Sequence, residues 1–361
     1  MTDVLHPRPN PIVAAMYTLR DLDADVVIIH GPAGCGFMAS RRLEEAGVRV
    51  VTTGMREGDL IFGAEEKLIN VLMHVEKEFH PKLVGIVGTC ASMIIGENLD
   101  SAIKKAKIQA TVIPVDIHGC AGPNTSGAIR TLEVAAQRGV VPQEEMERQR
   151  DMLNRATLLE QEKGMTSRTY LEPHNGATKL EVALEVVCTL RRGMSVGVVL
   201  NAKKETAFGF ADVMRAVEYA RKKVGGRTVH LGNLALGVGL PRIRRYAAEI
   251  TRDLQAAGVD LSCITGGLDE YPVAGEIAAH FLDERPVDLR VIAGLPHAIP
   301  GIRADDVLVT DQPRELRNLI DRGFARSVGE INTHAQVMNA HSILPNELGQ
   351  TIRQVVDGGL A

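Results

Sequence analysis

The chain has 361 residues, enough for about two or three domains, and a formal net charge of −4. Hydrophobic residues make up 45% of it and charged residues 24%, which is typical of a soluble globular protein. Because it has 3% aromatic residues, no tryptophan and no basic tract, it lacks the usual features of a nucleic-acid-binding surface. We therefore expect no nucleic-acid partner.

The start of the chain, Met1–Pro9, lacks the charged and apolar regions of a signal peptide. No apolar run reaches the roughly 20 residues that a membrane span needs. These features predict a cytoplasmic protein with no membrane partner. The five cysteines include no Cys-x-x-Cys pair, so they predict neither a disulfide framework nor a zinc ribbon. Their thiols remain available for metal or redox chemistry.

The first part of the chain alternates strand-like apolar runs with helical patterns. Strands are predicted at Val26–His30, Val48–Thr53, Leu83–Gly88 and Thr111–Val115. Helices are predicted at Phe62–Phe79, Ile94–Lys107 and Ala128–Gln137, where apolar residues recur at spacings of three and four. This alternation predicts a doubly wound, Rossmann-like parallel-sheet domain over residues 1–142.

Two cysteines, Cys35 and Cys90, each follow a predicted strand of this domain, where a helix then begins. A side chain there faces a crevice lined by backbone N–H groups, and the helix dipole favours the thiolate, the form that binds metal. Gly34 and Gly88 stand before these cysteines and are candidates for close approach of the backbone to a cofactor. The alternative is that both thiols are small buried hydrophobes.

A 4Fe-4S cluster normally takes about four cysteine ligands, so the pair in one chain is insufficient. In a symmetric dimer, the same pair from a second copy completes the set, with the cluster on the two-fold axis. Cys120 follows the next strand and is a rival ligand. Cys188 and Cys263 fall in a helical pattern and near a strand of the second half, so we interpret both as structural.

A strongly polar segment separates the two halves of the chain. Residues 143–170 are predicted to form an exposed helix and a linker, and their charge runs, including Glu160-Gln161-Glu162-Lys163, are interpreted as a solvated face. Residues 171–326 then predict a second doubly wound parallel-sheet domain, and residues 327–361 a C-terminal helical tail. Its predicted strands are Ser195–Leu200, Arg227–Leu231, Asp260–Ile264, Leu289–Ala293 and Val307–Thr310.

Glycine-rich turns follow the strands of the second domain and supply further candidates. His297 follows the turn after residues 289–293 and is a candidate proton donor, as His30 and His118 are beside the turns of the first domain. Lys203 and Lys204 are candidates to bind carboxylates. The alternatives are structural histidines and solvated charges. Because no Gly-x-x-x-x-Gly-Lys-Ser/Thr occurs, this chain is not expected to hydrolyse ATP through a P-loop.

Three stretches in combination resemble the nitrogenase component-one family, most strongly within residues 25–130. They are His30-Gly31-Pro32-Ala33-Gly34-Cys35, residues 52–68 beginning Thr52-Thr53-Gly54-Met55-Arg56, and Gly88-Thr89-Cys90-Ala91-Ser92-Met93-Ile94-Ile95-Gly96-Glu97-Asn98-Leu99. The family includes dark-operating reductases of chlorophyll precursors, in which an ATP-driven iron–sulfur reductase feeds electrons to a catalytic protein. The resemblance implies that Cys35 and Cys90 are cluster ligands.

The chain departs from the larger family members, because no cysteine precedes Cys35. The resemblance then implies one 4Fe-4S cluster shared by a homodimer. In its small size and its lack of an upstream cysteine, the chain most resembles the methanogen branch of the family. That branch reduces a nickel tetrapyrrole and closes its γ-lactam ring during synthesis of a nickel porphinoid coenzyme. That branch implies a homodimeric, ATP-hydrolysing iron–sulfur reductase as partner.

Three alternatives to this function remain open. A scaffold for metallocluster assembly would share the fold and the cysteines, and a reductase of a different tetrapyrrole would differ in the pocket. An ordinary dinucleotide-binding enzyme would use the glycine-rich turns and leave the thiols free of metal.

Overall fold

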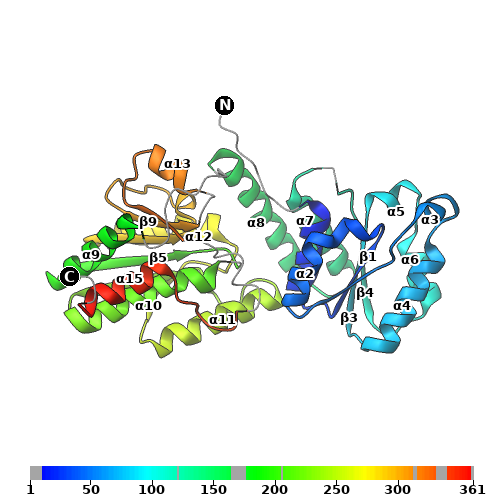
Figure 1. The fold of residues 1–361 in the computed structure, drawn as a ribbon, viewed down its shortest axis with the longest axis horizontal. Helices are drawn as coiled ribbons and strands as arrows, with labels where there is room; N and C mark the ends of the chain where they lie inside the picture. The colour runs from blue at the N-terminus through cyan, green and yellow to red at the C-terminus, as the bar shows by residue number, and fades with distance from the viewer. Residues whose placement is uncertain are drawn as a thin grey trace. The chain divides into compact units, whose positions relative to one another are not determined.

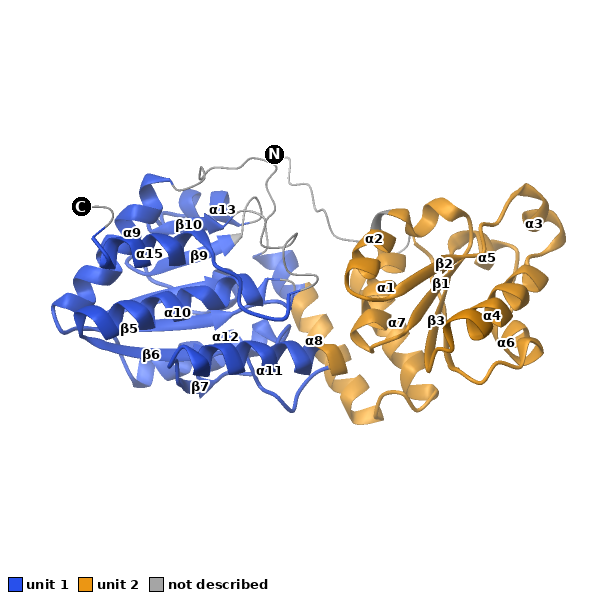
Figure 2. Ribbon diagram, turned by 60° about the horizontal axis from the view of Figure 1, so that its bottom comes forward, with its two compact units in different colours: residues 1–7, 158–239, 243–361 blue, residues 8–157, 240–242 orange. Residues whose placement is uncertain are grey.

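The computed structural model describes residues 10–119, 122–163, 176–204, 206–311, 315–330 and 340–358. The chain divides into two compact units (Figure 2). One comprises residues 8–157 and 240–242, and the other residues 1–7, 158–239 and 243–361. The boundary between residues 157 and 158 falls inside α8 (Gln143–Glu162), whereas the first domain was predicted to end at residue 142.

The first unit contains a four-stranded parallel sheet in the order β2-β1-β3-β4. Its strands are β1 (Val26–His30), β2 (Arg49–Thr52), β3 (Leu83–Gly88) and β4 (Thr111–Asp116). Helices α4 (Glu65–Phe79) and α6 (Leu99–Ala106) pack together on one face (Figure 1). The other face carries α1 (Pro11–Asp21), α2 (Phe37–Glu45) and α7 (Asn124–Gln137). This is the predicted doubly wound fold.

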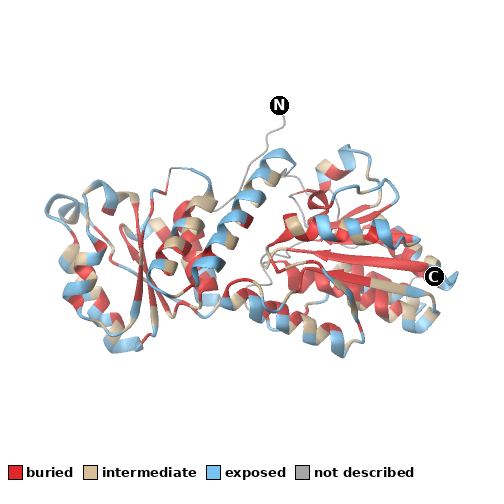
Figure 3. Cartoon of the chain, turned by 180° about the vertical axis from the view of Figure 1, so that it is seen from behind, coloured by how far each residue is buried: buried red, intermediate tan, exposed pale blue. Residues whose placement is uncertain are grey.

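The core of this unit follows from the apolar spacing in the sequence. Leu68, Leu72 and Val75 recur along one side of α4 and pack, fully buried, against alternate residues of the central strands, such as Val26 and Ile28. The central strands are buried along their length (Figure 3). These two periodicities explain why the sequence predicted this sheet well.

One predicted helix of the first unit is divided into two in the structure. The apolar pattern predicted a helix at Ile94–Lys107, but α5 (Cys90–Ile94) ends there and α6 begins only at Leu99. Gly96 has a positive φ of 72°, which breaks the helix, and the Asn98 side chain caps α6. The pattern was misleading because Ile94 is apolar yet 78% exposed.

The second unit contains a six-stranded parallel sheet in the order β10-β9-β8-β5-β6-β7. Its strands are β5 (Ser195–Asn201), β6 (Arg227–Gly232), β7 (Leu261–Ile264), β8 (Leu289–Gly294), β9 (Val307–Asp311) and β10 (Ser327–Glu330). The first five match the predicted strands within one residue at each end. No strand was predicted at β10, which has only four residues and lies at the start of the predicted C-terminal tail.

Helices cover both faces of this second sheet. Helices α9 (Ala177–Arg191), α10 (Ala207–Val224) and α15 (Glu347–Val356) pack against one another (Figure 1). The remaining helices are α11 (Pro241–Ala256), α12 (Tyr271–Glu284) and α13 (Leu316–Asp321). Among the described residues, no helix has both the length and the apolar composition needed to cross a bilayer.

The chain reverses direction across each sheet at one place. In the first sheet β1 leads to β2 on one side, and β3 leads to β4 on the other, so the reversal lies between β1 and β3. In the second sheet it lies between β5 and β8. In open α/β sheets, ligands bind outside the carboxyl ends of the strands at such a switch point. We call these two places the first and the second switch point.

Candidate functional site

Cys35 and Cys90 follow the two strands that flank the first switch point. His30, the last residue of β1, lies opposite Gly88, the last residue of β3. Cys35 then sits in a short 3₁₀ helix, Ala33–Gly36, and Cys90 is the first residue of α5. Both thiols are half-buried. The structure therefore brings the two predicted ligands to neighbouring strand ends.

Cys90 has polar neighbours from the loop that follows β4. Its Sγ accepts a hydrogen bond from the backbone N–H of Gly119 at 3.1 Å, and the Nδ1 atom of the exposed His118 lies 3.7 Å from the same sulfur. N–H donors to sulfur stabilise thiolate ligands and tune cluster potentials. The rival ligand Cys120 lies outside the described residues.

The two glycines named with the cysteines have different surroundings. A Cβ on the exposed Gly34 would meet no atom within 4 Å, so the backbone there is open to approach. A Cβ on the buried Gly88 would lie 2.5 Å from Asp116 Oδ1 and 3.2 Å from Ser92 Oγ. At Gly88 the missing side chain makes room for packing at the strand end.

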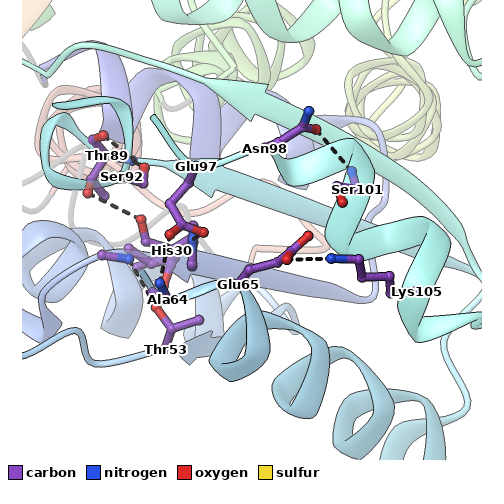
Figure 4. A network of polar contacts seen from close by, with 12 residues as sticks. His30, Thr53, Ala64, Glu65, Thr89, Ser92, Glu97, Asn98, Ser101 and Lys105 are labelled. Atoms are coloured by element: carbon purple, nitrogen blue, oxygen red, sulfur yellow. Dashed lines mark hydrogen bonds and ion pairs between the residues drawn. The ribbon is translucent and has the colours of Figure 1, made fainter. Parts of the chain in front are cut away.

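A buried polar network ties together the turns after β1, β2 and β3 (Figure 4). Thr89 Oγ1 donates to the carbonyl of His30 at 3.2 Å, and Thr53 Oγ1 accepts from Gly31 N–H at 3.1 Å. Glu97 accepts from Ala64 N–H at 2.7 Å. Its other carboxylate oxygen lies 3.4 Å from His30 Nε2. The network fixes the cysteine-bearing turns relative to one another.

His30 is completely buried beneath these turns. Burial lowers the pKa of its imidazole, although Glu97 opposes that shift. A lowered pKa favours the neutral imidazole, which suits a residue that holds the cysteine-bearing turns in place. In the sequence, Glu97 stands only as one member of the motif from Gly88 to Leu99, which assigns it no role.

Large apolar side chains are exposed around the same strand ends. We call them the apolar rim: Phe37, Leu60, Ile61, Phe62, Met93 and Ile94. Phe37 begins α2 after β1, three belong to α3 (Glu57–Phe62) after β2, and two belong to α5 after β3. Phe62 is 88% exposed, Ile94 78% and Ile61 75%. Because these three helices follow neighbouring strands of one sheet, their exposed apolar side chains are candidates for an interaction surface.

The second switch point carries the other predicted residues. Lys203 follows β5, and His297 lies in a 3₁₀ turn, Pro296–Ala298, directly after β8. The Lys203 Nζ atom lies 2.7 Å from Glu160 Oε1 and 4.8 Å from the centre of the Tyr271 ring. Lys204 Nζ lies 2.9 Å from Asp269 Oδ2. Each lysine thus has a carboxylate partner within the second unit.

His297 is buried between two carboxylates. Its Nδ1 atom lies 2.6 Å from Glu315 Oε1, an ion-pair contact rather than a well-aligned hydrogen bond, and its Nε2 atom lies 3.9 Å from Glu160 Oε2. Tyr271 OH donates to Glu160 Oε1 at 3.0 Å. Although burial alone favours the neutral imidazole, Glu315 and Glu160 raise its pKa above the ordinary value.

One interpretation of the polar segment was wrong for a single residue. Glu160 was assigned to a solvated face, but its side chain is only 11% exposed and contacts Lys203, Tyr271 and His297. Its sequence neighbours at 161–163 are exposed, as expected. The sequence of a charged run does not indicate which single side chain points inward, because tertiary contacts decide the position of that side chain.

A thiolate pair fits half of an iron–sulfur site. Within the described ranges, no group of three or more histidine, cysteine, aspartate and glutamate side chains gathers closely enough to hold a metal ion. Cys35 and Cys90 nevertheless supply soft sulfur donors. The Gly119 N–H donates to the Cys90 sulfur, and the backbone at Gly34 is open to the approach of a cofactor. Ligands from a second polypeptide would complete such a site.

Comparison with known proteins supports the same family. Residues 11–161 match the model described as "Nitrogenase component 1 type Oxidoreductase". A protein of Methanothermobacter thermautotrophicus, named Ni-sirohydrochlorin a,c-diamide reductive cyclase complex, component CfbD, is 46% identical over 97% of this chain and 98% of its own length.

Two relatives with the same name agree. The protein of Methanosarcina acetivorans is 41% identical, over 98% of this chain and 97% of its own. That of Methanocaldococcus jannaschii is 39% identical, over 97% of this chain and 98% of its own. The family resemblance inferred from the sequence motifs is confirmed. This chain belongs to the nitrogenase component 1 family, within the group of reductive cyclase components named CfbD.

Proposed function

We propose that this chain is the cluster-bearing catalytic subunit of a reductive cyclase that reduces Ni-sirohydrochlorin a,c-diamide and forms its γ-lactam ring. The observation that carries the proposal is the pair Cys35 and Cys90 at adjacent strand ends, in a chain that matches the CfbD proteins over nearly its full length. The proposed substrate is the one that appears in the name of these relatives.

The proposed cofactor is one 4Fe-4S cluster held by Cys35 and Cys90 of each of two chains. When bound, such a cluster supplies electrons one at a time at low potential. The chain's own groups support this arrangement: Gly119 N–H orients the Cys90 sulfur, and the buried His30–Glu97 network fixes the turns. A rigid pair of turns presents the two sulfurs in a constant geometry.

The apolar rim is proposed to be covered by a second copy of this chain. The rim belongs to the helices that follow β1, β2 and β3, and Cys35 and Cys90 lie in the turns after β1 and β3, so pairing this edge across a two-fold axis would bring four thiols together. Burying side chains such as Phe62 and Ile94 also excludes water from the site. This coupling makes dimer formation and cluster assembly one event.

The second switch point is proposed to bind the substrate, with His297 as proton donor and Lys203 and Lys204 as partners of its carboxylates. Each lysine must exchange its internal carboxylate for one of the substrate's. We expect Lys204→Met to weaken substrate binding by about 1–3 kcal/mol, the usual range for a hydrogen bond to a charged group. Fluorescence or absorbance titration of the nickel tetrapyrrole measures this.

The matched control for Lys204→Met is Lys223→Met. Lys223 lies in the last turn of α10, where it stacks over the Tyr219 ring. Its loss should leave substrate affinity unchanged, and iron content should be normal in both variants. Equal affinity in wild type and Lys204→Met would exclude Lys204 from the substrate site.

The proposed electron donor is a separate ATP-hydrolysing iron–sulfur reductase, because the family resemblance implies ATP-coupled electrons and this sequence contains no P-loop. The test is anaerobic incubation of the pure chain with Ni-sirohydrochlorin a,c-diamide, ATP and a reductase homodimer. Reduced, lactam-containing product should form only in the complete mixture. The chain alone should release no phosphate, and phosphate release at turnover rates would contradict the assignment.

The same incubation separates the alternative functions. A scaffold for metallocluster assembly would hold iron yet give no product. A reductase of another tetrapyrrole would turn over a different macrocycle with the same reductase. Both outcomes would leave the cysteine site in place and overturn only the named reaction.

A further inference from the structure

The polar cluster at the second switch point contains more negative than positive charge unless His297 is protonated. The charged groups that act on His297 are Glu315, Glu160 and Lys203. With a neutral imidazole, these three groups sum to one net negative charge in a buried place. With an imidazolium, the four groups balance. A buried uncompensated charge is strongly unfavourable, so balance favours the imidazolium.

The contacts distribute these charges around the ring. Glu315 lies against Nδ1 at 2.6 Å, and Glu160 faces Nε2 from 3.9 Å. Glu160 Oε1 is engaged by Lys203 and Tyr271, while its Oε2 is the oxygen nearest the imidazole. Thr310 Oγ1 lies 3.4 Å from Glu315 Oε2. Both carboxylates are therefore held from their far sides, with one oxygen directed to each ring nitrogen.

We infer that Glu315 and Glu160 are positioning residues that keep His297 as a buried imidazolium, a proton store at the second switch point. The inference rests on the proposed function for its role and deepens it. In the proton transfer, the N–H bond at Nε2 breaks, the proton moves to the reduced macrocycle, and neutral imidazole remains. The electrons come from the reductase, and one solvent proton restores the imidazolium.

The elements of this cluster come from distant parts of the chain. Glu160 lies in the last turn of α8, Lys203 follows β5, His297 follows β8 and Glu315 precedes α13. Assembling four chargeable groups in a buried place costs desolvation that an apolar core would avoid. A proton store gives this arrangement a chemical use, since the imidazolium is held ready without contact with bulk water.

The test follows the titration of His297 by NMR in anaerobic protein with ¹³C-labelled histidine, with His297→Gln identifying its resonance. We expect the His297 signal to titrate at a higher pH than that of an ordinary histidine, because the Glu315 and Glu160 carboxylates favour the imidazolium. Glu315→Gln should lower its proton affinity about tenfold, equivalent to one pKa unit, and Glu160→Gln should lower it in the same direction.

The matched control is Glu162→Gln, which removes an exposed carboxylate from the same helical turn as Glu160. It should leave the His297 titration unchanged. A His297 that titrates at or below the ordinary histidine value, or a titration unaltered by both Glu315→Gln and Glu160→Gln, would overturn the inference. Because neither substrate nor reductase is present, failure of the proposed reaction would leave this result interpretable.

A second measurement needs no assignment of resonances. Since the pKa of His297 is raised in the folded protein, its contribution to stability is complete below the unfolded value, about 6.5, and is lost as the pH rises through the folded value. The fall in unfolding free energy above pH 6.5 should be smaller in Glu315→Gln than in wild type and should end at a lower pH, because the folded-state pKa of His297 is lower in the variant. Identical pH profiles above pH 6.5 would contradict the inference.

Discussion

Cys90→Ala protein is expected to lose all of its cluster iron, and Cys35→Ala protein should do the same. With two chains sharing four irons, wild type purified without oxygen should contain about two irons per chain. Removing one thiol from each chain takes away two of four ligands, because the dimer is symmetric. Iron analysis, visible absorbance and the electron paramagnetic resonance of the reduced protein measure the loss.

The control for this experiment is Cys188→Ala. Cys188 is exposed on α9 in the second unit and should be dispensable for iron binding. A cluster that survives Cys90→Ala would refute the ligand assignment and make Cys120 the next residue to test. Loss of iron in Cys188→Ala as well would show that the assay reports general instability.

Ile94→Asp should separate the dimer and remove the cluster in the same step. Ile94 is 78% exposed in the single chain, so the monomer should fold normally with an aspartate there. At a closed interface the new carboxylate would be buried without a partner, which typically costs about 3–5 kcal/mol. That corresponds to a dimer dissociation constant weakened more than about a hundredfold. Analytical ultracentrifugation under anaerobic conditions measures it.

Met73→Asp is the matched control for the interface. Met73 is 53% exposed in the middle of α4, in the same unit but outside the apolar rim. It should remain dimeric and retain its iron. If Ile94→Asp and Phe62→Asp both remain dimers, the interface lies elsewhere, and the rim requires a different occupant.

The sheets and the cysteine positions could be predicted because they rest on local patterns. Short apolar runs such as residues 26–30 and 83–88 indicate buried strands when helical patterns separate them. A cysteine directly after such a run must lie at the carboxyl edge. The order β2-β1-β3-β4, which puts Cys35 and Cys90 beside the same reversal, came only from the structure.

The residues that the sequence analysis missed depend on contacts between distant segments. Glu160 looks like its solvated neighbours, yet it contacts groups 43 and 111 residues away, Lys203 and Tyr271. Glu97 pairs with His30 across 67 residues. Neither carboxylate has a local signature. Glu97 did have one local clue to a special role, because it stands beside the helix-breaking Gly96 within a motif of the family.

Native mass spectrometry of the anaerobic protein tests the central claim most directly. We expect one species of two chains carrying a single Fe₄S₄ unit, and cluster-free single chains for Cys35→Ala and Cys90→Ala. A single chain that carries a complete cluster, or a dimer that carries two, would contradict the assignment of one cluster held jointly by Cys35 and Cys90 of both subunits.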